Sequence, residues 1–180
     1  MSNPNERIQQ WVGEISAYSH VDWSRMPEID LYMDQVITYM DKQLSVFRRN
    51  DDAKALTSSM INNYVKDELL KSPERKKYSR DHLAALHMIC MLKQVLSIPD
   101  VSDLLKLLLE NQPIEDMYTS FRDIQKRAFT EVADRVSAMG DNGGSLIPLV
   151  LELSLEANAR RTAVEKIISE MSRGDVAEKE

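Results

Sequence analysis

The sequence predicts a mainly helical, all-α protein. Only five Gly and six Pro occur among the 180 residues, whereas Leu, Met, Lys and Glu, which favour helices, are frequent. Apolar residues recur every three or four positions along most of the chain, which is the spacing of an amphipathic helix. Strands are expected only as a short hairpin within residues 71–78.

Residues 1–55 are expected to form an N-terminal helical segment. A first amphipathic helix is predicted within residues 6–20, where Trp11, Val12 and Ile15 lie at helical spacing. A second helix is expected over about 28–47, with Pro27 in its first turn, where proline is tolerated. The polar stretch RRNDDAK, residues 48–54, then interrupts the helical pattern.

The central segment, residues 56–112, contains a short helix, a turn and two longer helices. Thr57 is suited to cap the short helix, and the following stretch KSPERKK is predicted to be a turn. Ser79 is expected to cap a helix that is apolar nearly all round, which indicates a central, buried element. Pro99 opens the last helix of the segment.

The C-terminal third is predicted to be a helical hairpin, residues 113–172. Two amphipathic helices, at 114–139 and 145–171, flank the Gly-rich break GDNGG. This hairpin is expected either to complete the core or to form a homodimer. Residues 173–180 are predicted to be a disordered tail.

The distribution of charge is uneven. The net charge of the whole chain is −6, which taken alone argues against nucleic-acid binding. Residues 57–80, however, carry six Lys or Arg and only three Asp or Glu, a local net charge of +3. Because salt screens charges beyond a Debye length of about 10 Å, the local sign decides what this surface attracts.

The order of motifs in residues 57–105 resembles the MerR-type winged helix-turn-helix. LTSSMINNYVKDELL corresponds to the recognition helix, KSPERKKYS to a short basic wing, and SRDHLAALHMICMLKQVLSIPDVSDLL to the helices behind them. The whole chain is also similar to an uncharacterised family, mainly of Gram-positive bacteria, that has a segment like MPEIDLYMDQVI ahead of a MerR-like helix-turn-helix. The resemblance implies sequence-specific binding of double-stranded DNA by a transcription regulator.

Eleven residues are expected to contact DNA. Asn62 and Asn63 suit an adenine edge, Lys66 suits a phosphate or a guanine, and the basic residues of the wing suit phosphates or the minor groove. The resemblance further implies that Tyr64 bonds the DNA backbone and that Tyr78 anchors the wing. The full set is Thr57, Ser58, Ser59, Asn62, Asn63, Tyr64, Lys66, Arg75, Lys76, Lys77 and Arg80.

The net negative charge of the whole chain and the departures from the MerR pattern keep a second interpretation open. Relatives of that type usually have arginine near the positions of Ser59 and Asn62, and a glycine in a longer wing, but here both are absent. The alternative is a protein–protein adaptor that uses a winged-helix scaffold without binding DNA.

No residue pattern points to catalysis, a cofactor or a metal. Cys90 lies in an apolar helix and is expected to be a buried hydrophobe, and a lone cysteine cannot form an intramolecular disulfide. His82 and His87 are five residues apart, which does not suit a helical ligand pair. With neither a signal-peptide pattern nor a membrane-spanning stretch, the protein is expected to be cytoplasmic. Whether a small-molecule effector binds is not indicated.

Overall fold

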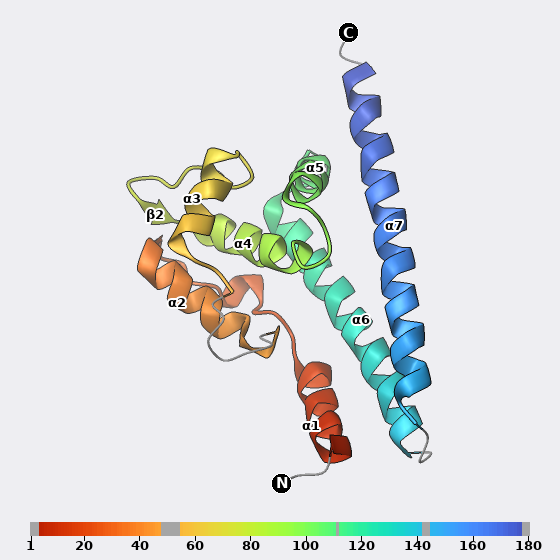
Figure 1. The fold of residues 1–180 in the computed structure, drawn as a ribbon. Coiled ribbons are helices and arrows are strands. Elements are labelled where there is room, and N and C mark those ends of the chain that lie inside the picture. Colours follow the sequence, from red (N-terminus) through yellow and green to blue (C-terminus); the bar gives the residue numbers. More distant parts are fainter. Residues whose placement is uncertain (1–3, 48–54, 111, 142–144, 178–180) are drawn as a thin grey trace. The chain divides into compact units, whose positions relative to one another are not determined.

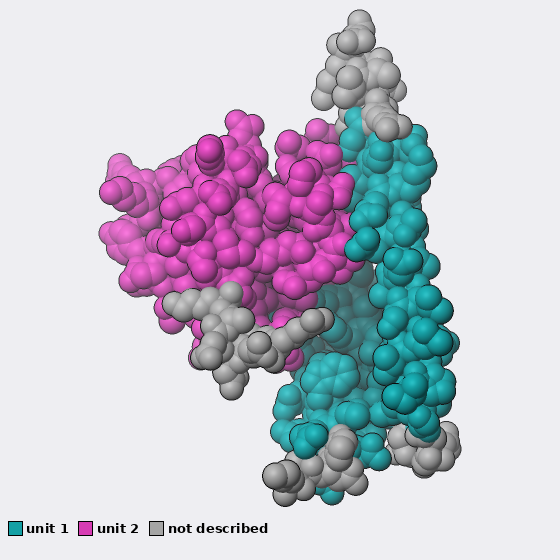
Figure 2. Space-filling model, viewed as in Figure 1, with its two compact units in different colours: residues 1–19, 122–180 teal, residues 20–121 magenta. Residues whose placement is uncertain are grey.

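The computed structural model describes residues 4–47, 55–110, 112–141 and 145–177, and the predicted helical fold is confirmed over them (Figure 1). The chain divides into two compact units (Figure 2). One comprises residues 20–121, and the other combines residues 1–19 with 122–180. The sequence instead predicts boundaries near residues 55 and 112, because no local pattern indicates that residues 20–47 pack with the central helices.

The unit of residues 20–121 is built from short elements around one long buried helix. A 3₁₀ turn, η1 (Trp23–Arg25), precedes strand β1 (Leu31–Tyr32), helix α2 (Met33–Gln43) and a second 3₁₀ turn, η2 (Ser45–Phe47). Helix α3 (Ser58–Lys66), strand β2 (Lys77–Tyr78), helix α4 (Arg80–Leu92), helix α5 (Ile98–Leu109) and the first residues of α6 (Ile114–Asp141) follow.

A two-stranded antiparallel sheet joins the segment before α2 to the segment before α4. Leu31 pairs with Tyr78, and Tyr32 pairs with Lys77. The sequence predicts that the second helix already begins near residue 28, and that boundary is wrong. The helix begins at Met33, and the backbone N–H of Tyr32 donates to Gln35 Oε1 at 2.9 Å instead of joining the helical ladder.

Helix α4 forms the centre of this unit, as the sequence predicted. The buried residues of α4 are His82, Leu83, Ala84, Leu86, His87, Met88, Ile89 and Cys90. Around it lie buried side chains of neighbouring elements, including Val36, Met40, Ile61 and Val101. Burial of so many apolar side chains is the main stabilising contribution to this unit, at roughly 1.5–3 kcal/mol for each large one.

Aromatic rings surround His87, which is fully buried. His20, Tyr39 and Tyr118 lie with ring centroids 5.4, 6.1 and 5.8 Å from the imidazole of His87. His87 Nδ1 donates to the Leu83 carbonyl oxygen at 2.9 Å. Burial lowers the pKa of His87 from 6.5 to about 4, so the imidazole is neutral near neutral pH.

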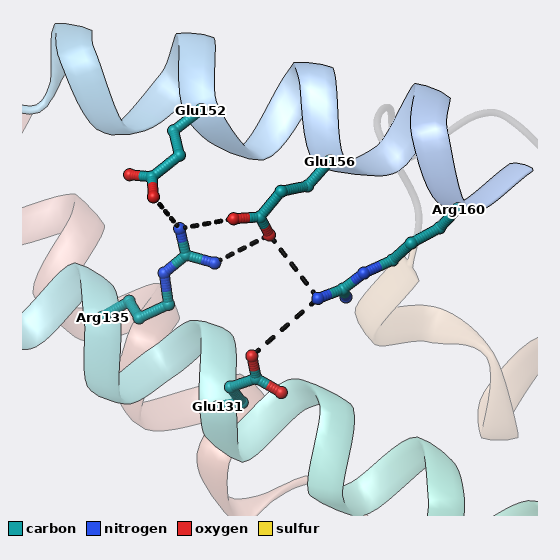
Figure 3. Close-up of polar contacts among 5 residues, drawn as sticks. All are labelled: Glu131, Arg135, Glu152, Glu156 and Arg160. Atoms are coloured by element: carbon teal, nitrogen blue, oxygen red, sulfur yellow. Dashed lines mark hydrogen bonds and ion pairs between the residues drawn. The ribbon is translucent and has the colours of Figure 1, made fainter.

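The second unit contains α1 (Pro4–Ala17), the remainder of α6 from residue 122, and α7 (Ile147–Ala177). Ion pairs show that α6 and α7 run antiparallel: Glu131 pairs with Arg160, and Arg135 pairs with Glu156 (Figure 3). The predicted helical hairpin is therefore present. Helix α7 continues to Ala177, beyond the predicted end at residue 172, and part of the predicted Gly-rich break lies outside the described residues.

Among the residues that the structure describes, no helix combines the length and apolarity needed to cross a membrane.

Candidate nucleic-acid interface

Helix α3 is short because its two ends are fixed locally. The Thr57 hydroxyl oxygen accepts the backbone N–H of Met60 at 3.3 Å, which satisfies one free donor at the N-terminus. At the other end Glu68 has a φ of 56°, which turns the chain out of the helix. Ile61 and Tyr64 are buried, so the helix has one fixed inner side.

The outer side of α3 is polar and exposed. Residues four apart lie on the same side of a helix, so Ser58, Asn62 and Lys66 form one row and Ser59 and Asn63 form a second. All five side chains are exposed, as the sequence predicted. The first row spans about 12 Å along the helix axis at a rise of 1.5 Å per residue.

Tyr64, in contrast, faces the interior. Its side chain is only 5% exposed, and its hydroxyl accepts from Lys93 Nζ at 3.4 Å. Lys93 Nζ also donates to the Ala55 carbonyl oxygen at 3.1 Å. Burial raises the pKa of Tyr64 to about 12. These contacts fix α3 to the end of α4 and leave little of the Tyr64 side chain for an external partner.

The basic turn predicted between α3 and α4 is a tight reversal. The backbone N–H of Lys77 donates to the Glu74 carbonyl oxygen at 2.9 Å. Arg75 and Lys76, between them, have φ values of 50° and 64°. Two successive positive φ values are typical of a type I′ turn, in which Asn and Gly are preferred. Side chains other than Gly adopt this conformation at a cost of roughly 1–2 kcal/mol each.

The side chains of the turn differ in exposure. Arg75 and Lys76 are exposed, whereas Lys77 is half-buried. The Lys77 ammonium lies 5.3 Å from the centroid of the Tyr32 ring, a cation–π contact across the sheet. The turn, defined here as residues 74–77, is therefore attached to the β1 segment through both the backbone ladder and a side chain.

Arg80, at the start of α4, contacts the segment around η1. One guanidinium nitrogen donates to the Met26 carbonyl oxygen at 3.4 Å and lies 3.7 Å from the Glu28 carboxylate. The guanidinium carbon is 5.6 Å from the centroid of a Trp23 ring. Sequence reasoning missed the partners Trp23 and Tyr32, because the residues that face them are distant in the chain.

The eleven predicted residues thus fall into two groups. Seven are exposed on α3 or the turn: Ser58, Ser59, Asn62, Asn63, Lys66, Arg75 and Lys76. Thr57, Lys77 and Arg80 are half-buried and Tyr64 is buried, and each of these four makes contacts within the unit. Tyr78, expected to anchor the wing, is 3% exposed and pairs with Leu31.

Cys90 is buried, as predicted, and burial raises the pKa of its thiol to about 11, so it is not a reactive thiolate. Within the described ranges, no three His, Cys, Asp or Glu side chains are grouped so that they could hold a metal ion.

A comparison with family models matches residues 21–121 to the family described as Domain of unknown function (DUF1836). The chain belongs to the DUF1836 family. The match covers more than half of the 180 residues. No curated protein and no solved structure matches the chain.

The DUF1836 domain coincides with the compact unit that begins at residue 20 and ends at residue 121. Helix α3, the basic turn and the β1–β2 sheet all belong to it. The family description assigns no function, so the chemistry of this domain must be argued from its own side chains.

Proposed function

We propose that the DUF1836 domain binds double-stranded DNA as a winged helix-turn-helix, within a transcription regulator. The observation that carries the proposal is the pairing of a short helix with a polar, exposed outer side and a tight turn that exposes two basic side chains. In this proposal α2 and α3 form the helix-turn-helix, and residues 71–78 form the wing.

The order of elements supports this proposal. A strand and two helices precede the turn, and two further helices follow it. The β1–β2 pairing ties the chain before the first of these helices to the chain after the turn. The wing base is thereby fixed to the same body that carries α3.

Helix α3 supplies the groups for base recognition. Asparagine can bond both N6 and N7 of adenine in the major groove, and serine hydroxyls donate or accept. Asn62 lies at the centre of the exposed row and is the first candidate for base contact. Lys66, one turn later, suits a phosphate or a guanine.

The turn supplies the phosphate contacts. Arg75 and Lys76 take backbone conformations that Asn and Gly would adopt at lower cost, and residues held in such conformations cluster at functional sites. Their positive charge and exposure suit the DNA backbone. We assign them as the main electrostatic contacts of the wing.

Salt-dependent binding tests the proposal. Fluorescence anisotropy with genomic and random-sequence duplexes should show an affinity that falls steeply as salt increases, since each neutralised phosphate contributes roughly 0.9 to the slope of log K against log salt. Binding that is undetectable at low salt would falsify DNA recognition.

Charge-reversal variants locate the contact. Arg75→Glu with Lys76→Glu should abolish binding to duplex DNA. The matched control is Lys126→Glu with Arg127→Glu, which makes the same change in net charge at exposed positions of α6. Equal losses in both variants would show that net charge, and not the turn, governs the interaction.

We further propose that the regulator acts as a homodimer, because two-fold DNA sites match two-fold proteins. Helix α7 exposes a row of aliphatic side chains: Ile147, Val150, Leu151 and Leu155 are 58–74% exposed. Light scattering should report a dimer mass, and Leu151→Glu with Leu155→Glu should reduce it to the monomer. A monomer mass for the unmodified protein at all concentrations contradicts dimerisation.

The same aliphatic row favours a second candidate function, a protein–protein adaptor that does not bind DNA. Affinity capture from a nuclease-treated bacterial lysate separates the two. An adaptor retains a defined protein partner after nuclease treatment and shows no binding to duplex DNA in the anisotropy experiment. A DNA-binding regulator binds duplex DNA in the anisotropy experiment and retains no defined protein partner after nuclease treatment.

A further inference from the structure

The two-stranded sheet has a buried face and an exposed face. Leu31 pairs with Tyr78, and these two side chains are 8% and 3% exposed. Successive side chains of a strand point to opposite faces, so the other pair, Tyr32 and Lys77, lies on the outer face. Tyr32 is 51% exposed and Lys77 is half-buried. This pair therefore forms the outer surface of the sheet.

The outer face continues into the basic turn. Arg75 and Lys76, whose side chains are exposed, directly precede Lys77. Figure 1 shows β2, at the end of the turn, beside the first residues of α2, and β1 immediately precedes that helix. Tyr32 thus lies next to the side chains proposed to contact the DNA backbone, and a contact between Tyr32 and DNA would extend the same surface.

Carboxylates also lie near this pair. Asp30 and Asp34 flank Tyr32 in the sequence and are exposed, and Glu74 precedes the two exposed basic residues of the turn. These carboxylates weaken the positive field of the turn. Binding of an anion at this place therefore depends on donors that are held close together, and not on net charge.

Tyr32 and Lys77 hold two such donors close together. The Lys77 ammonium lies 5.3 Å from the centroid of the Tyr32 ring, and it forms no ion pair within the part of the chain that the structure describes. A cation–π contact at an exposed site is weak, and an ammonium has three donors, so Lys77 can still bind an anion. The Tyr32 hydroxyl belongs to the same ring and stays near that ammonium.

We propose that Tyr32 and Lys77 together bind one backbone phosphate of duplex DNA. The Tyr32 hydroxyl and the Lys77 ammonium donate to oxygens of the same phosphate, beside the phosphates assigned to Arg75 and Lys76. Tyrosine and lysine side chains are both common donors to DNA phosphates. This inference rests on the proposed DNA-binding function and adds to it a residue, Tyr32, that the sequence did not indicate.

The ring and the hydroxyl of Tyr32 have separate roles in this arrangement. The ring packs against Lys77 and supports the turn, whereas the hydroxyl is needed only when a phosphate is bound. Tyr32→Phe should therefore leave urea unfolding unchanged and weaken binding to random-sequence duplexes about fivefold or more, as expected for one hydrogen bond to a charged group. Because the hydroxyl is uncharged, the salt slope should stay the same.

The matched control is Tyr39→Phe. The Tyr39 hydroxyl is also removed there, but it is buried within the DUF1836 domain and cannot reach DNA. This variant should bind duplex DNA with the affinity of the unmodified protein. Equal affinities of Tyr32→Phe and the unmodified protein overturn the inference and leave the proposed function standing. If the unmodified protein binds no duplex at low salt, both fail.

A double-variant cycle tests whether the two side chains share one phosphate. Lys77→Gln should weaken binding and reduce the salt slope by about 0.9, the contribution of one neutralised phosphate. Combining it with Tyr32→Phe should cost less than the product of the two single losses, because both donors serve the same group. Losses that multiply fully would assign the two side chains to separate phosphates and overturn the shared contact.

A neutral linkage in the DNA locates the phosphate. In a duplex selected from a randomised pool, a single methylphosphonate replaces each backbone phosphate in turn. At one linkage the unmodified protein should lose affinity, and Tyr32→Phe should lose clearly less. If every linkage affects the two proteins equally, Tyr32 does not bind a phosphate.

Discussion

Tyr32 and Lys77 face each other across the two-stranded sheet, and the Lys77 ammonium lies 5.3 Å from the centroid of the Tyr32 ring. Only two residue pairs form this sheet, and a ladder this short contributes little by itself. The side-chain contact is therefore a substantial part of what holds the turn against the segment before α2.

Replacing Tyr32 should loosen the turn. Tyr32→Ala removes both the cation–π contact and the cross-strand packing, and we expect a loss of about 1 kcal/mol in the free energy of unfolding, measured with urea. Tyr32→Phe keeps the ring and should behave like the unmodified protein. A similar loss for both variants would show that the hydroxyl, and not the ring, matters.

A variant of the turn should change the stability of the domain and its affinity for DNA in opposite directions. Arg75→Asn with Lys76→Gly puts the preferred type I′ residues at φ values of 50° and 64°. The change should stabilise the domain by about 1 kcal/mol and weaken DNA binding, with a salt slope smaller by roughly 0.9 for each phosphate that is no longer neutralised. Urea unfolding and anisotropy measure the two effects. If the variant is more stable and binds DNA equally well, Arg75 and Lys76 do not contact DNA.

Asn62 should affect sequence preference more than overall affinity. Asn62→Ala removes a side chain that can bond adenine on both N6 and N7, a contact worth about 1–3 kcal/mol of discrimination. Selection from a randomised duplex pool should therefore yield a less specific consensus at one position. Asn158→Ala, at an exposed position on α7, is the matched control. An unchanged consensus for Asn62→Ala would rule out adenine readout by this residue.

The sequence indicated the helices and the exposed side of α3 correctly, because both follow from local spacing. Thr57 caps α3, and the helix containing His82 to Cys90 is buried, as its apolar pattern predicted. These properties depend on residues within a few turns of one another, which is the range over which periodicity is informative.

Contacts between residues that are distant in the sequence could not be predicted from local spacing. Strand β1 has only two residues, Leu31 and Tyr32, too few for an alternating pattern, and its partner strand follows only after α2 and α3. The role of Arg80 against Met26 and Glu28 likewise depends on the fold.

Acid should destabilise the DUF1836 domain through His87. Its folded-state pKa of about 4 lies below the ordinary 6.5, so the unfolded chain binds more protons between these values. Stability should therefore fall by about 3 kcal/mol as the pH decreases from 6.5 to 4, a window set by that shift. Urea unfolding across this range measures the slope. His87→Phe fills the aromatic cluster without a titrating group and should flatten it, and an unchanged slope in this variant assigns the effect to other groups.

Arg135 should stabilise the α6–α7 hairpin only while its partner is ionised. Its guanidinium donates two hydrogen bonds to the Glu156 carboxylate, at 2.8 and 3.0 Å, and lies 3.1 Å from the Glu152 carboxylate (Figure 3). The hydrogen bonds from Arg135 lower the pKa of Glu156 below its ordinary 4.5. The contribution is therefore complete above that value and is lost as the pH falls through the depressed pKa.

Arg135→Gln should consequently lower the thermal unfolding midpoint at neutral pH, and the difference from the unmodified protein should shrink below pH 4.5, the ordinary value for Glu156. The control is Arg161→Gln, because Arg161 pairs with Glu165 within one helix, at 3.3 Å, and does not join the two helices. Exposed pairs within a helix contribute little, so this variant should unfold almost normally. A difference for Arg135→Gln that persists unchanged in acid would mean that the arginine acts through packing of its aliphatic stem and not through its charge.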